Sequence, residues 1–74
     1  MMITVKLFAY FREKRGKVLY LDEKIFHTPN DVCKELNIDP EQVGILLING
    51  FHAKFDVPLK NGDLVSLFPP VAGG

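Results

Sequence analysis

The first part of the chain alternates between apolar and polar positions as a β-strand does. Residues 3–10 alternate with period two, with Ile3 and Val5 on one face, and this pattern predicts a strand. Residues 11–16 are mostly charged and end at a glycine, which predicts a tight loop or one helical turn. Residues 17–21 predict a second strand, and the short gap between the two strands indicates an antiparallel hairpin.

A helix is predicted to begin at residue 28, where the sequence carries three start signals. Thr28 is a suitable cap, Pro29 suits the first helical position, and Asp31 stands where a capping-box acid bonds back to the cap amide. Pro40 bars continuation, so the helix is expected to end near Asn37. A helix this short depends on packing for its stability.

The second half of the chain contains an unbroken apolar run followed by a turn signal. Residues 44–48 are apolar after the leading glycine, Asn49-Gly50 follows, and residues 51–55 resume an apolar pattern. Asn-Gly between two such runs is the strongest short-range signal for a β-hairpin. We therefore expect two antiparallel strands here.

The chain closes with one more strand and a proline-rich end. Residues 60–63 predict a turn, and residues 64–68 predict the last strand. Pro69 and Pro70 cannot donate hydrogen bonds to a sheet ladder, so the strand must stop before them. Residues 69–74 are then expected to leave the fold as a flexible tail.

The order strand, strand, helix, strand, strand, strand predicts an α+β fold. A single short helix packed on one face of a mixed sheet of about five strands is the compact solution, and the β-grasp (ubiquitin-like) arrangement fits it. In that arrangement the first and last strands lie side by side, parallel and central. We expect residues 1–68 to form this domain and residues 69–74 to protrude from it.

Length and composition limit the chain to one small globular domain without a disulfide. It has 74 residues, 47% of them apolar, and Cys33 is its one cysteine, which favours a reducing compartment. No apolar run is long enough to span a membrane and no signal peptide is visible, so we expect a cytoplasmic protein without a membrane partner.

The charge distribution argues against a nucleic-acid partner. The formal net charge is zero, whereas nucleic-acid binding modules usually carry a basic excess. Residues 1–20 nevertheless carry a net charge of +4, balanced by −4 in the remainder. This basic segment is either a solvated turn or a docking patch for an acidic partner.

The sequence offers no constellation for catalysis or metal binding of its own. The candidate groups are few: Ser66 lies in a strand, Cys33 is expected to be a half-buried core residue, and His27 and His52 have no ligand spacing. The glycines before the chain's final segment are isolated at turns or strand edges, so no phosphate loop is predicted; they are Gly16, Gly44, Gly50 and Gly62. We expect no bound cofactor, no metal and no catalysis by the chain alone.

The unusual feature is the terminal pair Gly73-Gly74, which follows the two prolines after a short spacer. The prolines stiffen the base of the tail, and residues without side chains let an α-carboxylate enter a narrow active site of another protein. A carboxylate is a poor electrophile. A partner must therefore activate it, for instance by adenylation with ATP.

Several segments resemble the MoaD/ThiS family of ubiquitin-like sulfur carriers. The resemblance is strongest for the small subunit of molybdopterin synthase, and it includes a specific proline-proline and glycine-glycine ending. The residues that carry it are Val5–Glu13, Asn49-Gly50, Pro58–Pro70 and Val71, Ala72, Gly73 and Gly74.

This resemblance implies a β-grasp fold and a defined cycle. An ATP-dependent activating enzyme (an adenylyltransferase) would adenylate the carboxylate of Gly74, and a sulfur donor system would convert it to a thiocarboxylate. The tail, with Gly73 as the flexible neighbour, would then enter the large subunit of molybdopterin synthase. ATP is used by the partner in this cycle, and the carrier binds no cofactor.

Other roles remain open at this point. The stretch between the second predicted strand and Gly44 is shorter than is typical of the molybdopterin subunit, so tungsten-cofactor assembly, thiamine synthesis and another sulfur pathway are alternatives. A third possibility is a protein modifier joined to target lysines through Gly74. A plain structural domain is the remaining alternative.

A partner surface is expected on the face of the sheet that one helix cannot cover. The alternative is that loops with Phe51 or Phe55 fold over this face. The residues predicted to form the docking surface are Phe8, Phe68, Pro69 and Pro70, with one of Leu46 or Ile48.

Overall fold

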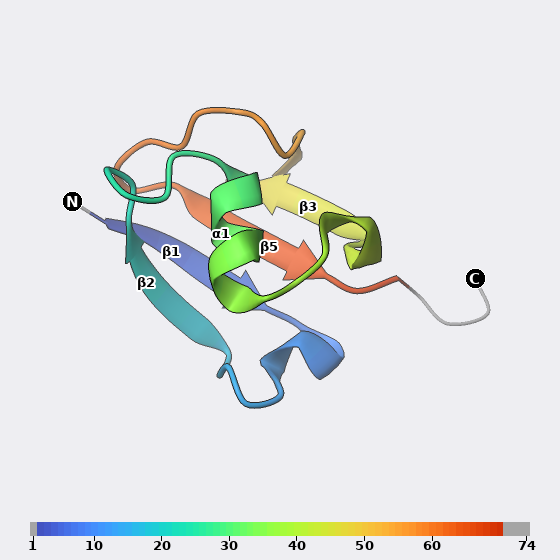
Figure 1. Cartoon of the computed structure of the whole chain (residues 1–74). Coiled ribbons are helices and arrows are strands. Elements are labelled where there is room, and N and C mark those ends of the chain that lie inside the picture. The colour runs from blue at the N-terminus through green and yellow to red at the C-terminus, as the bar shows by residue number, and fades with distance from the viewer. Residues whose placement is uncertain (1, 71–74) are drawn as a thin grey trace.

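The computed structural model describes residues 2–70, and its framework is a five-stranded sheet in the order β2-β1-β5-β3-β4 (Figure 1). One helix, α1, lies across one face of this sheet, and two short 3-10 helices, η1 and η2, lie in the connections. The bounds are β1 Met2–Leu7, η1 Ala9–Arg12, β2 Val18–Asp22, α1 Pro29–Leu36, η2 Pro40–Gln42, β3 Ile45–Ile48, β4 Phe51–His52 and β5 Leu64–Phe68. No helix within residues 2–70 is long and apolar enough to cross a membrane.

The central pair of the sheet joins the two ends of the domain. β1 pairs with β5 in parallel, with Val5 opposite Val65, and it pairs with β2 in antiparallel fashion. β3 pairs antiparallel with the other side of β5. The α+β prediction and the β-grasp arrangement are therefore confirmed, including the central, parallel placement of the first and last strands.

β1 is shorter than the predicted strand over residues 3–10. It ends at Leu7, because Ala9 adopts a left-handed backbone with φ of 54° and the Phe11 amide donates to the carbonyl of Phe8 at 3.2 Å. These features start η1, so Tyr10 belongs to a helical turn and the prediction was wrong there. Alternation alone could not reveal this because Ala9 and Tyr10, the first two residues of η1, are compatible with a continuing strand.

The start of α1 is capped as predicted. The Asp31 amide donates to the Thr28 hydroxyl at 3.3 Å, and the Thr28 amide donates to the Asp31 carboxylate at 3.2 Å. Pro29 occupies the first helical position, and Asn37 closes the helix in the left-handed region with φ of 57°. These caps satisfy backbone groups that a helix of eight residues leaves unpaired at its ends.

The β3–β4 hairpin turns at Asn49-Gly50, as predicted. Both residues have positive φ, 54° and 85°, which a two-residue turn of the I′ type requires. β4 is limited to two residues, however, and does not extend to residue 55. The chain bends toward α1 instead, where the Phe55 carbonyl accepts a hydrogen bond from the Asn30 amide at 2.9 Å in the first helical turn.

The core lies between the sheet and α1. Alternate residues of the two central strands are fully buried there, and α1 contributes Val32 and Cys33, which are also fully buried. The expectation that Cys33 is half buried was wrong, because this small thiol side chain faces the sheet as a core residue. The strand residues concerned are Ile3, Val5, Leu7, Val65 and Leu67.

Candidate functional site at the end of β5

The sheet has an open face, which is the side turned away from α1. Register fixes its membership, because residues opposite one another on neighbouring strands share a face. Phe68 lies opposite Ile45, and Ser66 lies opposite both Leu47 and Lys6. Val65 and Leu67 face the core, so Ser66 and Phe68 of β5 belong to the open face. Their partners on the neighbouring strands belong to it too: Ile45, Leu47 and Lys6.

The prediction that Leu46 or Ile48 joins the docking surface was wrong. Leu46 lies opposite Leu67, and Ile48 lies opposite Val65, so both belong to the face that α1 covers. Ile45 and Leu47 occupy the open face in their place. Ile45 is 38% exposed, which makes it available for contact.

Phe8 and Phe68 form a stacked pair where β5 ends. Their ring centroids are 4.1 Å apart and the rings are inclined by 10°. The Phe8 amide donates to the Leu67 carbonyl at 3.2 Å, which holds the two segments side by side. Both rings are half buried, so one side of the pair remains accessible.

A cation lies against this aromatic pair. The guanidinium carbon of Arg12 is 5.3 Å from the centroid of the Phe8 ring, within the range of a cation–π interaction. The Arg12 Nε donates to the Leu7 carbonyl at 2.7 Å, which fixes the side chain over the ring. Arg12 is exposed, so the basic segment seen in the sequence contributes a positive charge at the edge of the aromatic pair.

Pro69 and Pro70 follow directly, and we call these two residues the tail root. Pro69 is buried and Pro70 is exposed. The Gly44 amide donates to the Phe68 carbonyl at 2.7 Å just before the root. The structure thus brings the four predicted surface residues to one end of the sheet, while the predicted tail residues Val71, Ala72, Gly73 and Gly74 lie outside the described residues.

Phe51 and Phe55 do not cover the open face. Phe51 is 76% exposed and pairs with Ile48, which faces α1, and Phe55 packs against the core. Tyr20 and Val18 of β2, at the far side of the open face, are 65% and 41% exposed. Within the described part of the chain, the open face therefore carries apolar side chains at both sides, separated by Lys6 and Ser66 in its centre.

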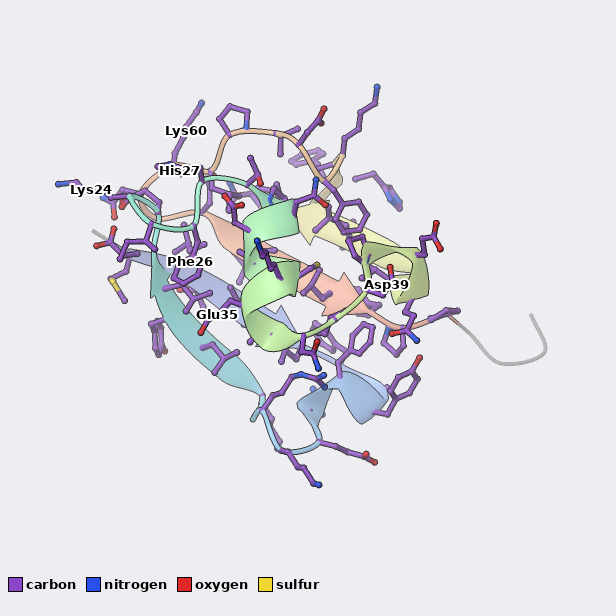
Figure 2. The ribbon with its side chains drawn as sticks, in the orientation of Figure 1. Lys24, Phe26, His27, Glu35, Asp39 and Lys60 are labelled. Carbon is purple, nitrogen blue, oxygen red and sulfur yellow. The ribbon has the colours of Figure 1, made fainter. Side chains whose placement is uncertain are left out.

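The groups considered for chemistry stay apart. Burial, followed by the nearby Asp39 carboxylate, raises the pKa of the Cys33 thiol to about 11, so it remains protonated and a poor nucleophile at neutral pH. His27 lies near Lys60 at the end of the molecule opposite to the tail root (Figure 2). Among residues 2–70 no group of three or more His, Cys, Asp or Glu side chains could hold a metal ion.

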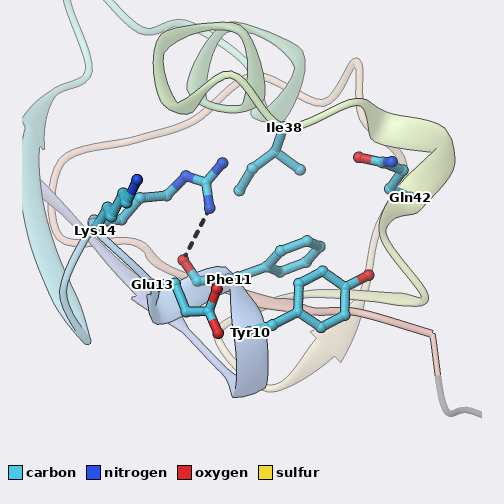
Figure 3. A pocket seen from close by; sticks show the side chains of 7 residues that line it. Tyr10, Phe11, Glu13, Lys14, Ile38 and Gln42 are labelled. Carbon is cyan, nitrogen blue, oxygen red and sulfur yellow. Dashed lines mark hydrogen bonds between the residues drawn. The ribbon is translucent and has the colours of Figure 1, made fainter.

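A hollow of about 400 Å³ lies between η1 and the segment after α1 (Figure 3). Arg15 at its edge joins these elements, because its Nε donates to the Leu36 carbonyl at 2.8 Å and its Nη1 donates to the Phe11 carbonyl at 3.3 Å. The Arg15 guanidinium therefore forms hydrogen bonds to backbone carbonyls of both elements. Sequence reasoning missed this role, since a contact between positions 21 residues apart leaves no local pattern.

The sequence profile of the ThiS family matches residues 5–74, nearly the whole chain. The chain belongs to the ThiS family. Its β-grasp fold, with the last strand in the centre of the sheet, is that of the ubiquitin-like sulfur-carrier proteins that the sequence resembles. No curated protein matches the chain in a sequence search.

Solved structures agree with this assignment. SAMP1 from Haloferax volcanii is 26% identical with a TM-score of 0.77, and the match covers 100% of both chains. The HVO 2177 protein from Haloferax volcanii is 32% identical with a TM-score of 0.73, over 100% of this chain and 87% of that chain. In the complex of subunits 1 and 2 of the Helicobacter pylori molybdopterin-converting factor, the matched chain is 25% identical with a TM-score of 0.64, over 100% of both chains.

Proposed function

We propose that this protein is a sulfur carrier whose Gly74 carboxylate is adenylated and then converted to a thiocarboxylate that donates sulfur in molybdopterin synthesis. The observation that carries the proposal is that the family match continues through Gly74, beyond a last strand that is central to the sheet. A tail attached to the most buried strand has a fixed starting point, and its end can be offered to another protein.

The chemistry divides between the carrier and its partners. In the first step the Gly74 carboxylate oxygen attacks the α-phosphorus of ATP, pyrophosphate leaves, and an acyl-adenylate forms on the activating enzyme. Hydrosulfide supplied by the donor system then attacks the Gly74 carbonyl carbon and displaces AMP, and loss of the thiol proton leaves a thiocarboxylate. The resulting thiocarboxylate is ionised near neutral pH. In the large synthase subunit its sulfur attacks a carbon of the pterin precursor and displaces an oxygen substituent, and water then cleaves the bond between the sulfur and the Gly74 carbonyl carbon, which regenerates the carboxylate.

The role of the described residues is to bind partners and present the tail. Phe8 and Phe68 offer a flat apolar contact, with Ile45 and Pro70 beside it. Arg12 adds a positive charge that suits an acidic group on the partner. The Helicobacter pylori neighbour was solved as a complex of subunits 1 and 2, which supports a large-subunit partner for this chain.

A second candidate function is that of a ubiquitin-like modifier. The likeness to SAMP1, a small archaeal modifier protein, favours it. In that function the Gly74 acyl group of the same adenylate would be transferred to a lysine amine of a target protein, which forms an amide bond and releases AMP. Sulfur transfer for thiamine or tungsten-cofactor synthesis requires the same tail and differs only in the acceptor enzyme.

Addition of one residue after Gly74 tests the shared first step. In an ATP–pyrophosphate exchange assay with an activating enzyme of the ubiquitin-activating type, the native chain should support exchange and the extended chain should not. Equal exchange by the two proteins would rule out the proposal. Acceptor assays with the large molybdopterin-synthase subunit and with the thiamine-pathway enzyme then distinguish the pathways, and lysine-linked adducts would identify the modifier.

A further inference from the structure

We propose that Gly44 is a positioning residue for the tail, because its lack of a side chain sets the direction in which the chain leaves β5. This inference rests on the proposed function, since it concerns how the Gly74 carboxylate reaches a partner's active site. Gly44 lies between η2 and β3, one residue before the strand begins. It lies outside the docking surface predicted from the sequence.

The backbone conformation of Gly44 does not require glycine. Gly16, Gly50 and Gly62 have positive φ, where a side chain is strained, whereas Gly44 does not. A Cβ placed on Gly44 would instead lie 2.7 Å from the Pro70 Cα and 2.9 Å from both the Pro69 oxygen and the Pro70 nitrogen. The need for glycine therefore comes from the close approach of the tail root alone.

The neighbouring atoms cannot move aside as a flexible side chain would. All three belong to the backbone, and ordinary contact begins at 3.4 Å, so a methyl group would have to displace the root by about 0.7 Å. Phe68 is held by the Gly44 amide at 2.7 Å and by its stack on Phe8. Because Pro69 is buried and Pro70 is exposed, the displacement falls mainly on Pro70.

A displacement of the tail root changes the positions that the Gly74 carboxylate can reach. Proline fixes φ, so a shift at Pro70 also turns the direction in which the following residues start. Four residues follow Pro70, and they span at most about 14 Å when fully extended. A narrow channel that requires this full length would transmit the displacement to the reacting carboxylate, and a misplacement of about 1 Å can slow a reaction by about 100-fold.

The test uses the full chain with Ala introduced at Gly44, and measures adenylation by an activating enzyme of the ubiquitin-activating type. Because the stacked pair is untouched, docking should be preserved and KM for the carrier should change less than about twofold. The kcat should fall at least about tenfold. Gln42→Ala, a matched change at an exposed position two residues away, should leave both constants unchanged.

A second variant tests whether the loss of kcat comes from the changed direction of the chain after Pro70. Insertion of one glycine between Pro70 and Val71 in the Gly44→Ala protein should restore most of the lost kcat, because the longer tail can compensate for a displaced root. An unchanged kcat in Gly44→Ala, or a fall in kcat that the insertion does not relieve, would overturn the assignment. Loss of cooperative unfolding in Gly44→Ala would also overturn the assignment, because the strain would then lie in the sheet and not at the tail root. Absence of adenylation in the unaltered chain would instead refute the proposed function.

Discussion

Replacement of Phe68 with aspartate should weaken binding of this protein to the two proposed partners, an activating enzyme and the large subunit of molybdopterin synthase. The ring is half buried, stacked at 4.1 Å on Phe8, and accessible on its other side. An aromatic side chain at the centre of a contact surface typically contributes at least about 2 kcal/mol of binding free energy, which is about 30-fold in Kd. A carboxylate in the same place must also be desolvated on binding, so we expect a loss of at least this size.

The same substitution lowers stability by an amount that the fold should tolerate. Full burial of a phenylalanine contributes about 1.5–3 kcal/mol, so half burial corresponds to about 1 kcal/mol. The stack on Phe8 contributes about 1 kcal/mol more. The total of about 2 kcal/mol is below the stability of about 3–5 kcal/mol expected for a domain of this size, and urea denaturation should still show one cooperative transition.

The matched control is Tyr20→Asp. Tyr20 lies on the same open face and is 65% exposed, but it belongs to β2, which β1 separates from β5. Isothermal titration calorimetry should give a Kd for Tyr20→Asp within about twofold of the unaltered protein, and Phe68→Leu should retain most of the affinity. Undiminished binding by Phe68→Asp, or an equal loss in Tyr20→Asp, would show that the surface at the end of β5 is not the docking site.

Three further predictions concern stability. Arg15→Ala should lower stability by about 1–2 kcal/mol and Tm by about 5–10 °C, because it removes hydrogen bonds to the Leu36 carbonyl at the end of α1 and to the Phe11 carbonyl in η1. A change in Tm below about 1 °C in scanning calorimetry would exclude this. Thr28→Ala should cost about 1 kcal/mol in urea denaturation by removing the cap, and no loss would contradict the capping box. The folded Cys33 thiol has a pKa of about 11, against an ordinary 9.0, so it keeps its proton to higher pH than the unfolded thiol does. The free energy of unfolding should therefore fall as the pH rises between these two values, and it should fall less steeply in Cys33→Val, which has no thiol. Equal slopes of unfolding free energy against pH in the two proteins would refute this.

Local signals in the sequence predicted the framework of the fold well. Thr28 and Asp31 form the predicted capping box, and Asn49-Gly50 makes the predicted turn, because in each case residues close in sequence supply the whole motif. The two central strands could also be paired, since few topologies satisfy this order of elements. The prediction was least accurate at the ends of strands, where a single residue such as Ala9 changes the backbone direction.

The candidate site was predicted less completely, for a physical reason. Residues 45–48 are all apolar, so the run contains no polar residue to show which side faces the core. The pairing with β5 decides this, and it places Ile45 and Leu47 on the open face. The approach of Gly44 to Pro70 joins segments distant in sequence, and it too could be recognised only from the structure.

The mass of the C-terminal peptide, isolated from cells that contain the activating enzyme and its sulfur donor, tests the central proposal most directly. We predict a fraction of the protein in which one sulfur replaces one oxygen, with fragmentation placing the change on Gly74. This fraction should disappear when the activating enzyme is deleted. Protein that carries only an ordinary carboxylate in both strains, or sulfur at a residue other than Gly74, would contradict the account.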